Sequence, residues 1–177
     1  DVYKRQRHSW PEELTAEYVV SAVLSDHPLP ANLEAQGRLA AAVERARSGP
    51  EPAIVDMPEI AATIDGARYD FRHADSGANW FVFRFHDGSA VFTTDEGNGP
   101  TDVQVGLDGR FMTDKVQPIA LRGTWQGDDT FVVEYQMIGQ VERGTVEFIF
   151  EDDVAHVTTR EAATGTIQSA IADRSAD

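Results

Sequence analysis

The sequence has no cysteine and is poor in basic residues. Its 177 residues include 15 Lys and Arg against 30 Asp and Glu, a formal net charge of −15. Without cysteine there can be no disulfides, thiolate metal ligands or cysteine nucleophile. The absence of cysteine does not identify the cellular compartment, because proteins on either side of a membrane can lack it. The scattered basic residues argue against nucleic acid as a partner, because phosphate contacts need clustered Lys and Arg. No run of about 18 apolar residues occurs, so we predict no membrane span.

Alternating apolar and polar residues dominate the chain from position 66 to 172. Phe81, Phe83 and Phe85 alternate with Val82, Arg84 and His86, the period of strands with one buried face. Turn residues such as Asp87-Gly88 separate the alternating runs. We predict strands near 67–72, 79–86, 89–94, 101–106, 110–114, 118–126, 130–138, 142–150, 153–160 and 164–172. Short loops favour a mainly β fold, an up-and-down antiparallel β-barrel of about 8–10 strands preceded by two short helices.

The N-terminal part predicts helices and a connector. Residues 1–6 (DVYKRQ) resemble the translated end of a sequencing adapter, so we expect them to be an artefact and the natural N-terminus to be missing. A helix within 7–27 starts at Ser9 as N-cap and has an apolar stripe that includes Leu14, Tyr18 and Val23. The connector, 28–65, contains a second helix from Asn32 to about Arg47, and residues 60–64 are either a short strand or a linker. Residues 173–177 form a tail.

Two adjacent segments carry a family resemblance. The run ALRGTW at 120–125, followed by DDTFVVEY at 128–135, resembles the C-terminal lipocalin-like β-domain of serine hydrolases of the class C β-lactamase and penicillin-binding-protein-like family. The runs VGLDG at 105–109 and EDD at 151–153 fit the same pattern. The resemblance implies a lipocalin-like barrel at 66–172. It also implies that 7–27 is the last helix of a truncated hydrolase domain and that 28–65 connects the two.

The chemistry of that family has no counterpart in this sequence. No serine is followed three residues later by lysine, and no tyrosine begins Tyr-x-Asn. We therefore assign no catalytic residue, cofactor or metal site to the chain itself. The resemblance implies a non-catalytic accessory domain, whose partner is the missing upstream serine hydrolase domain and which packs on it or shapes access to its active site. The alternative is a free-standing lipocalin-like binder of a small apolar ligand.

Other polar candidates have simpler interpretations. His73, His86 and His156 could bind zinc together, but they fall on separate strands or loops without ligand spacing, which favours isolated histidines. Paired carboxylates suit acid–base chemistry or Ca²⁺, yet each pair falls where a hairpin must turn, so we interpret them as turn caps. These pairs are Asp95 with Glu96, Asp128 with Asp129, and Asp152 with Asp153.

Aromatic residues are numerous enough to fill a barrel. An interior of about eight strands is just filled by side chains or holds one small ligand, and we predict a filled core. Arg84 and Arg122 are expected to face solvent, although an Arg at a barrel mouth could pair with an anion. The aromatic set is Tyr69, Phe71, Trp80, Phe81, Phe83, Phe85, Phe92, Trp125, Phe131, Tyr135, Phe148 and Phe150.

Overall fold

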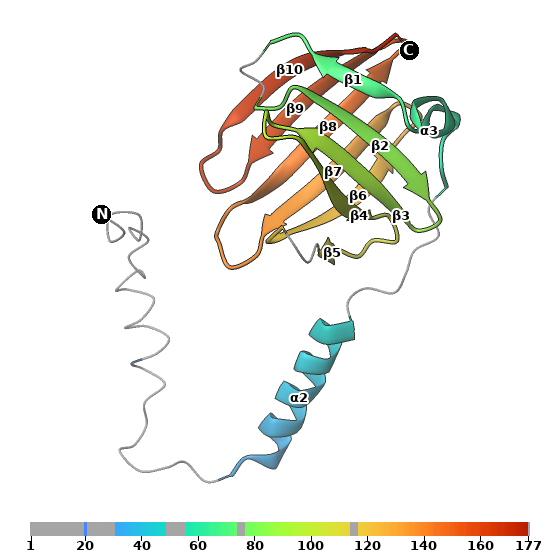
Figure 1. Cartoon of the computed structure of the whole chain (residues 1–177). Coiled ribbons are helices and arrows are strands. Elements are labelled where there is room, and N and C mark those ends of the chain that lie inside the picture. The colour runs from blue at the N-terminus through green and yellow to red at the C-terminus, as the bar shows by residue number, and fades with distance from the viewer. Residues whose placement is uncertain (1–19, 21–30, 49–55, 74–76, 114–116, 177) are drawn as a thin grey trace. The chain divides into compact units, whose positions relative to one another are not determined.

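The structure, a computed structural model, describes residues 20, 31–48, 56–73, 77–113 and 117–176. They contain helices α2 (Leu33–Ser48) and α3 (Glu59–Ile64) and ten strands (Figure 1). The strands are β1 (Arg68–Phe71), β2 (Trp80–His86), β3 (Ser89–Asp95), β4 (Pro100–Gly106), β5 (Met112–Thr113), β6 (Ile119–Gln126), β7 (Thr130–Met137), β8 (Arg143–Glu151), β9 (Val154–Glu161) and β10 (Ile167–Arg174). The predicted mainly β class is confirmed. β10 extends two residues into the segment predicted as a tail.

The chain divides into two compact units, residues 1–47 and 48–177. In the first, α2 begins where the sequence predicts it. The Oδ1 atom of Asn32 accepts a hydrogen bond from the Ala35 amide at 2.9 Å, which caps the helix. Leu33 and Leu39 on this helix are 78% and 66% exposed. The helix predicted from Ser9, with its stripe, lies outside the described residues.

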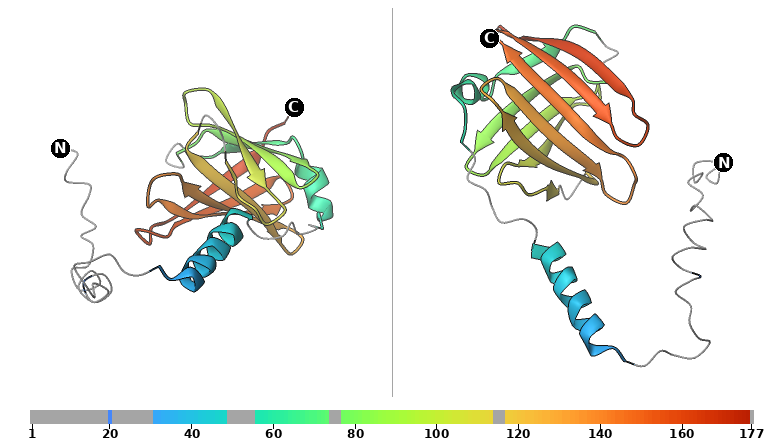
Figure 2. Two further views of the ribbon diagram at one scale, coloured as in Figure 1. Left: turned by 90° about the horizontal axis from the view of Figure 1, so that it is seen from below. Right: turned by 180° about the vertical axis from the view of Figure 1, so that it is seen from behind.

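The second unit is a closed barrel. Nine strands form the ring in the order β4-β3-β2-β1-β10-β9-β8-β7-β6, and β6 returns to β4. Seen from behind, the strands from β7 to β10 form one continuous wall (Figure 2). An odd number of alternating strands leaves one parallel pair, and here it is β4 with β6, where Val105 faces Leu121. The up-and-down barrel is confirmed, with this short parallel seam as its exception; β5 pairs only with β6.

Residues 59–64 form α3, so the expected short strand or linker at 60–64 is wrong. The helix is only six residues long and has no side-chain cap at Pro58, which leaves little local signal. Its position depends on burial: Ala61 and Ile64 are 2% and 1% exposed. Just after it, the Gly66 amide donates to the Phe83 carbonyl at 2.8 Å. α3 therefore closes the end of the barrel where β1 begins and β2 ends.

Aromatic rings fill the barrel next to α3. Phe83 packs edge-to-face on Phe131 and on Phe148, with ring centroids 5.2 and 5.0 Å apart. Tyr69 stacks on Phe81 at 5.3 Å. In this half of the interior the predicted filled core is confirmed. Further members of the aromatic set in this network of ring contacts are Phe71, Phe85, Phe92, Trp125 and Phe150.

Candidate ligand-binding cup

The barrel interior is open at the end opposite α3. Two adjoining chambers of about 510 and 580 Å³ occupy this end, and we call them together the cup. Both chambers are lined by Phe92, Thr94, Glu96, Val146 and Phe148. The first also includes Asn98, Gly99, Thr101, Val103, Gln117, Ile119, Leu121, Val133, Tyr135 and Met137, and the second Phe71, His73, Gly77, Ala78, Val157, Thr159, Gln168, Ser169, Ala170 and Ile171. The predicted filled core is wrong for this half.

Strand alternation explains where the cup lies. Every second residue of a strand points inward, and the inward rows change character along the barrel. On β3 the row runs from Phe92 to Thr94 and then to Glu96 in the following turn. On β9 it runs from Val157 to Thr159. On these two strands the inward side chains become more polar away from α3, and they leave the interior there unfilled.

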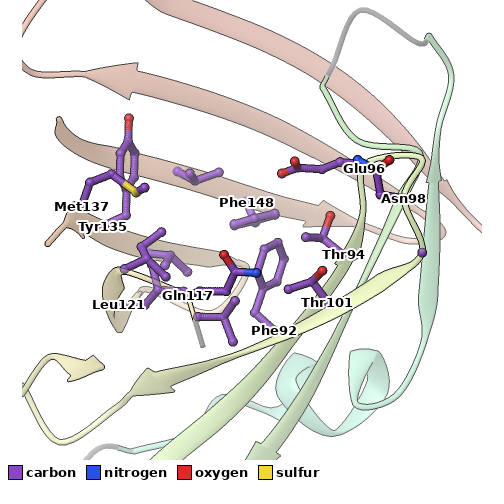
Figure 3. A pocket seen from close by; sticks show the side chains of 15 residues that line it. Phe92, Thr94, Glu96, Asn98, Thr101, Gln117, Leu121, Tyr135, Met137 and Phe148 are labelled. Atoms are coloured by element: carbon purple, nitrogen blue, oxygen red, sulfur yellow. The ribbon is translucent and has the colours of Figure 1, made fainter. Parts of the chain in front are cut away.

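The cup has an apolar floor and a polar rim. Phe148, 2% exposed, forms part of the floor and contacts the Phe92 ring at 6.0 Å between centroids. Figure 3 shows Thr94, Thr101 and Gln117 beside these rings. This arrangement suits a small ligand with an apolar body, because pockets of this kind combine a mainly apolar wall with a few polar groups.

The electrostatic environment of the rim is negative. Burial raises the pKa of Tyr135, and the carboxylates of Glu161 and Glu142 raise it further. Glu96 is exposed and lines both chambers. Among the described residues that line the cup there is no Arg or Lys. Among the described lining residues, the Glu96 carboxylate therefore has no Arg or Lys to balance it at the mouth.

Asp95 and Glu96 are adjacent in the turn before β4, but their side chains have different surroundings. Asp95 Oδ1 accepts hydrogen bonds from the amides of Gly97 and Gly99 at 2.8 and 3.0 Å, so its predicted role as a turn cap is confirmed. Glu96, which we interpreted in the same way, instead extends over the cup (Figure 3). The sequence contains one signal of this difference: a single carboxylate is enough to cap the turn, so the second of the two adjacent carboxylates is not needed there.

The other two carboxylate pairs lie in hairpin turns. Asp128 and Asp129 fall between β6 and β7, and Asp152 and Asp153 between β8 and β9. Asp152 has a φ of 52°, a left-handed conformation that Asp tolerates in tight turns. The Asp129 carbonyl accepts the Phe150 amide at 3.0 Å. These positions agree with the turn interpretation.

The structure does not bring the three barrel histidines together. His73 lines the second chamber, whereas His86 ends β2 at the α3 end of the barrel. His156 lies on β9, with its Nε2 atom 3.9 Å from Glu151 Oε2. Among the described residues, no group of three or more His, Asp or Glu side chains is arranged to hold a metal ion.

Arg84 and Arg122, which we expected to face solvent, lie on the outer face of the barrel. Arg122 Nε and Nη2 donate to the two carboxylate oxygens of Glu134 at 2.9 and 2.8 Å. The guanidinium also covers the Phe111 ring at 4.8 Å. Arg84 Nη1 lies 3.4 Å from Thr93 Oγ1. Neither arginine lines the cup.

The fold and the site define a class: a closed, nine-stranded β-barrel protein with a ligand-sized cup at one end. The sequence matches no protein-family model and no curated protein. In the part of the chain that the structure describes, no helix combines the length and apolar character needed to cross a membrane.

Proposed function

We propose that the chain supplies a non-catalytic accessory β-barrel domain to a β-lactamase-related serine hydrolase. The barrel packs on that hydrolase or shapes the approach to its active site. The sequence lacks the family's Ser-x-x-Lys and Tyr-x-Asn elements, so the reaction belongs to a partner domain.

The observation that supports this proposal is the location of the residues that carry the resemblance. The two motif segments coincide with β6, β7 and the turn between them, the hairpin beside the parallel seam. Within it, Trp125 and Phe131 pack at 4.8 Å, and Arg122 pairs with Glu134. The motif thus specifies barrel architecture rather than a reaction centre, as expected of an accessory domain.

The test is to recover the DNA upstream of the Arg7 codon from the source sample. The proposal requires an open reading frame that continues into Arg7 and encodes Ser-x-x-Lys and Tyr-x-Asn. An initiator methionine close upstream, with no such domain, would overturn it.

The cup favours a second candidate function, binding of a small apolar ligand. Neutral N-phenyl-1-naphthylamine is a suitable probe, because its fluorescence rises when it enters an apolar site. The full chain should bind it saturably. Val146→Trp, which places a large ring between the two chambers, should weaken binding at least tenfold while leaving the far-UV circular dichroism unchanged. Thr159→Trp fills the second chamber from another strand and serves as an independent variant. Probe binding unaffected by both would exclude the cup.

A further inference from the structure

Any ligand in the cup meets a gradient from apolar floor to acidic rim. The floor carries buried apolar side chains, of which Val133 and Phe148 are 4% and 2% exposed. The Thr94 and Thr101 hydroxyl groups lie farther out, and the Glu96 carboxylate extends over the opening (Figure 3). A ligand with a polar end can therefore bury its apolar body on the floor while the polar end reaches the rim. There the polar end avoids the cost of burial without a hydrogen bond.

The carboxylate of Glu96 is available to such a polar end. Asp95, not Glu96, holds the β3–β4 turn through its bonds to Gly97 and Gly99. Within the described part of the chain, no hydrogen bond or ion pair involves the Glu96 side chain. It nonetheless lines both chambers, so one carboxylate can meet the polar end of a ligand in either.

Three of the described basic side chains on or beside the barrel strands are paired with carboxylates. Arg72 is paired with Asp173 at 2.6 Å and Arg122 with Glu134 at 2.8 Å. Arg160 Nη2 lies 3.4 Å from Glu147. Glu142 and Glu161 add negative charge near Tyr135 on the opposite wall. The rim therefore repels a carboxylate head group and attracts an ammonium.

We propose that the cup binds a cationic amphiphile, whose apolar body fills the chambers and whose ammonium group pairs with Glu96. The inference rests on the second candidate function, ligand binding in the cup, and is independent of the accessory-domain proposal. It assigns the chemical class of the ligand: a protonated alkylamine with an aliphatic or aromatic body, rather than a fatty acid or a neutral lipid.

Three compounds with the same ten-carbon chain isolate the head group. Decylamine, decanol and decanoate, each below its solubility or micelle-forming limit, compete with bound N-phenyl-1-naphthylamine on the full chain at neutral pH. Decylamine should compete about fivefold better than decanol, the upper range for an exposed ion pair, and decanoate should compete worst. Glu96→Gln should remove the amine's advantage and leave decanol within twofold of its original affinity.

A matched variant separates Glu96 from the general negative charge of the protein. Glu151 is also an exposed turn-end glutamate, but it lies at the end of β8 away from the cup. Glu151→Gln changes the net charge equally and should leave the amine's advantage intact. Equal effects of Glu151→Gln and Glu96→Gln would overturn the role of Glu96.

The remaining outcomes distinguish ligand binding in the cup from the preference for a cationic ligand. If the probe does not bind, or if Val146→Trp and Thr159→Trp leave its binding unchanged, ligand binding in the cup fails and this inference fails with it. If the probe binds in the cup but decanoate competes as well as decylamine, only the cationic class is overturned. Preference for decylamine that is lost with Glu96→Gln alone is the expected result.

Discussion

Gly123 on β6 lies against the ring of Phe131 on β7, so closely that a Cβ atom at position 123 would overlap the ring. Such a carbon would lie 2.8 Å from Phe131 Cε2 and 3.0 Å from Leu107 Cδ2. The missing side chain therefore allows a fully buried ring to enter the core from the neighbouring strand.

Gly123→Ala should destabilise the barrel by about 1–3 kcal/mol, because a methyl group added to a packed interior forces the neighbours apart. Urea unfolding followed by tryptophan fluorescence measures the loss. Phe131→Leu in the same chain should reduce the cost of Gly123→Ala, since the overlapping ring is gone. As a control, Gly37→Ala in α2 adds a methyl group in open space and should not shift the barrel transition. An unchanged midpoint for Gly123→Ala would contradict the close packing.

The Arg122–Glu134 pair predicts a measurable cross-strand coupling. The two residues face each other in register, with side chains 33% and 39% exposed. Partial exposure weakens the pair, so a double-mutant cycle with Arg122→Ala and Glu134→Ala should give about 0.5–1 kcal/mol. Arg160 with Glu147, joined by a single contact of 3.4 Å, is the matched comparison and should couple less. Equal coupling energies would show that the bidentate geometry adds nothing.

Strand positions could be predicted because their signals are local. On β6, the period of two places Leu121, Gly123 and Trp125 on one face without knowledge of any partner strand. Turn residues such as Gly127, with a φ of 80°, mark where the chain reverses. Together they give the hairpin order and hence the barrel.

The cup and α3 depend on interactions that the sequence order does not reveal. Ile64 is helical and buried because the barrel end covers it, not because its own segment favours a helix. The cup arises from the summed volumes of side chains on strands far apart in sequence, such as Thr94 and Thr159. Alternation identifies which residues point inward but not whether they fill the space, so it could not show that Glu96 lines a cup.

Tyr69 provides a test of the cost of an unpaired polar group. Its side chain is buried, its hydroxyl has no hydrogen-bond partner among the residues that the structure describes, and burial raises the pKa of the phenol. Tyr69→Phe should therefore leave the free energy of unfolding unchanged or raise it by up to about 1 kcal/mol. Chemical denaturation of the two proteins gives the comparison. A clear loss of stability would mean that the hydroxyl is satisfied in solution.

Asp173 predicts a loss of stability in acid. Hydrogen bonds from Arg72, together with its charge, hold the pKa of Asp173 below its ordinary value of 3.8. A carboxyl with a lower pKa in the folded state stabilises the fold above pH 3.8, and this stabilisation is lost as the pH falls through the folded-state pKa. Asp173→Asn should thus lower the thermal midpoint at neutral pH, and the difference from the original protein should vanish below the folded-state pKa. A difference that persists there would assign the effect to packing.

Ile64 tests whether α3 is an integral closure of the barrel. This side chain is 1% exposed and belongs to the same core cluster as Phe83 and Phe131. Ile64→Ala should cost about 2–4 kcal/mol, since it leaves a cavity that the surrounding strands cannot fill. Ile167→Ala makes the same chemical change on β10 at a side chain that is 64% exposed, and it should stay within about 0.5 kcal/mol. Because the cup opens at the other end, Ile64→Ala protein that is still folded should bind the neutral probe normally. Similar costs for the two substitutions would mean that α3 only rests on the barrel surface.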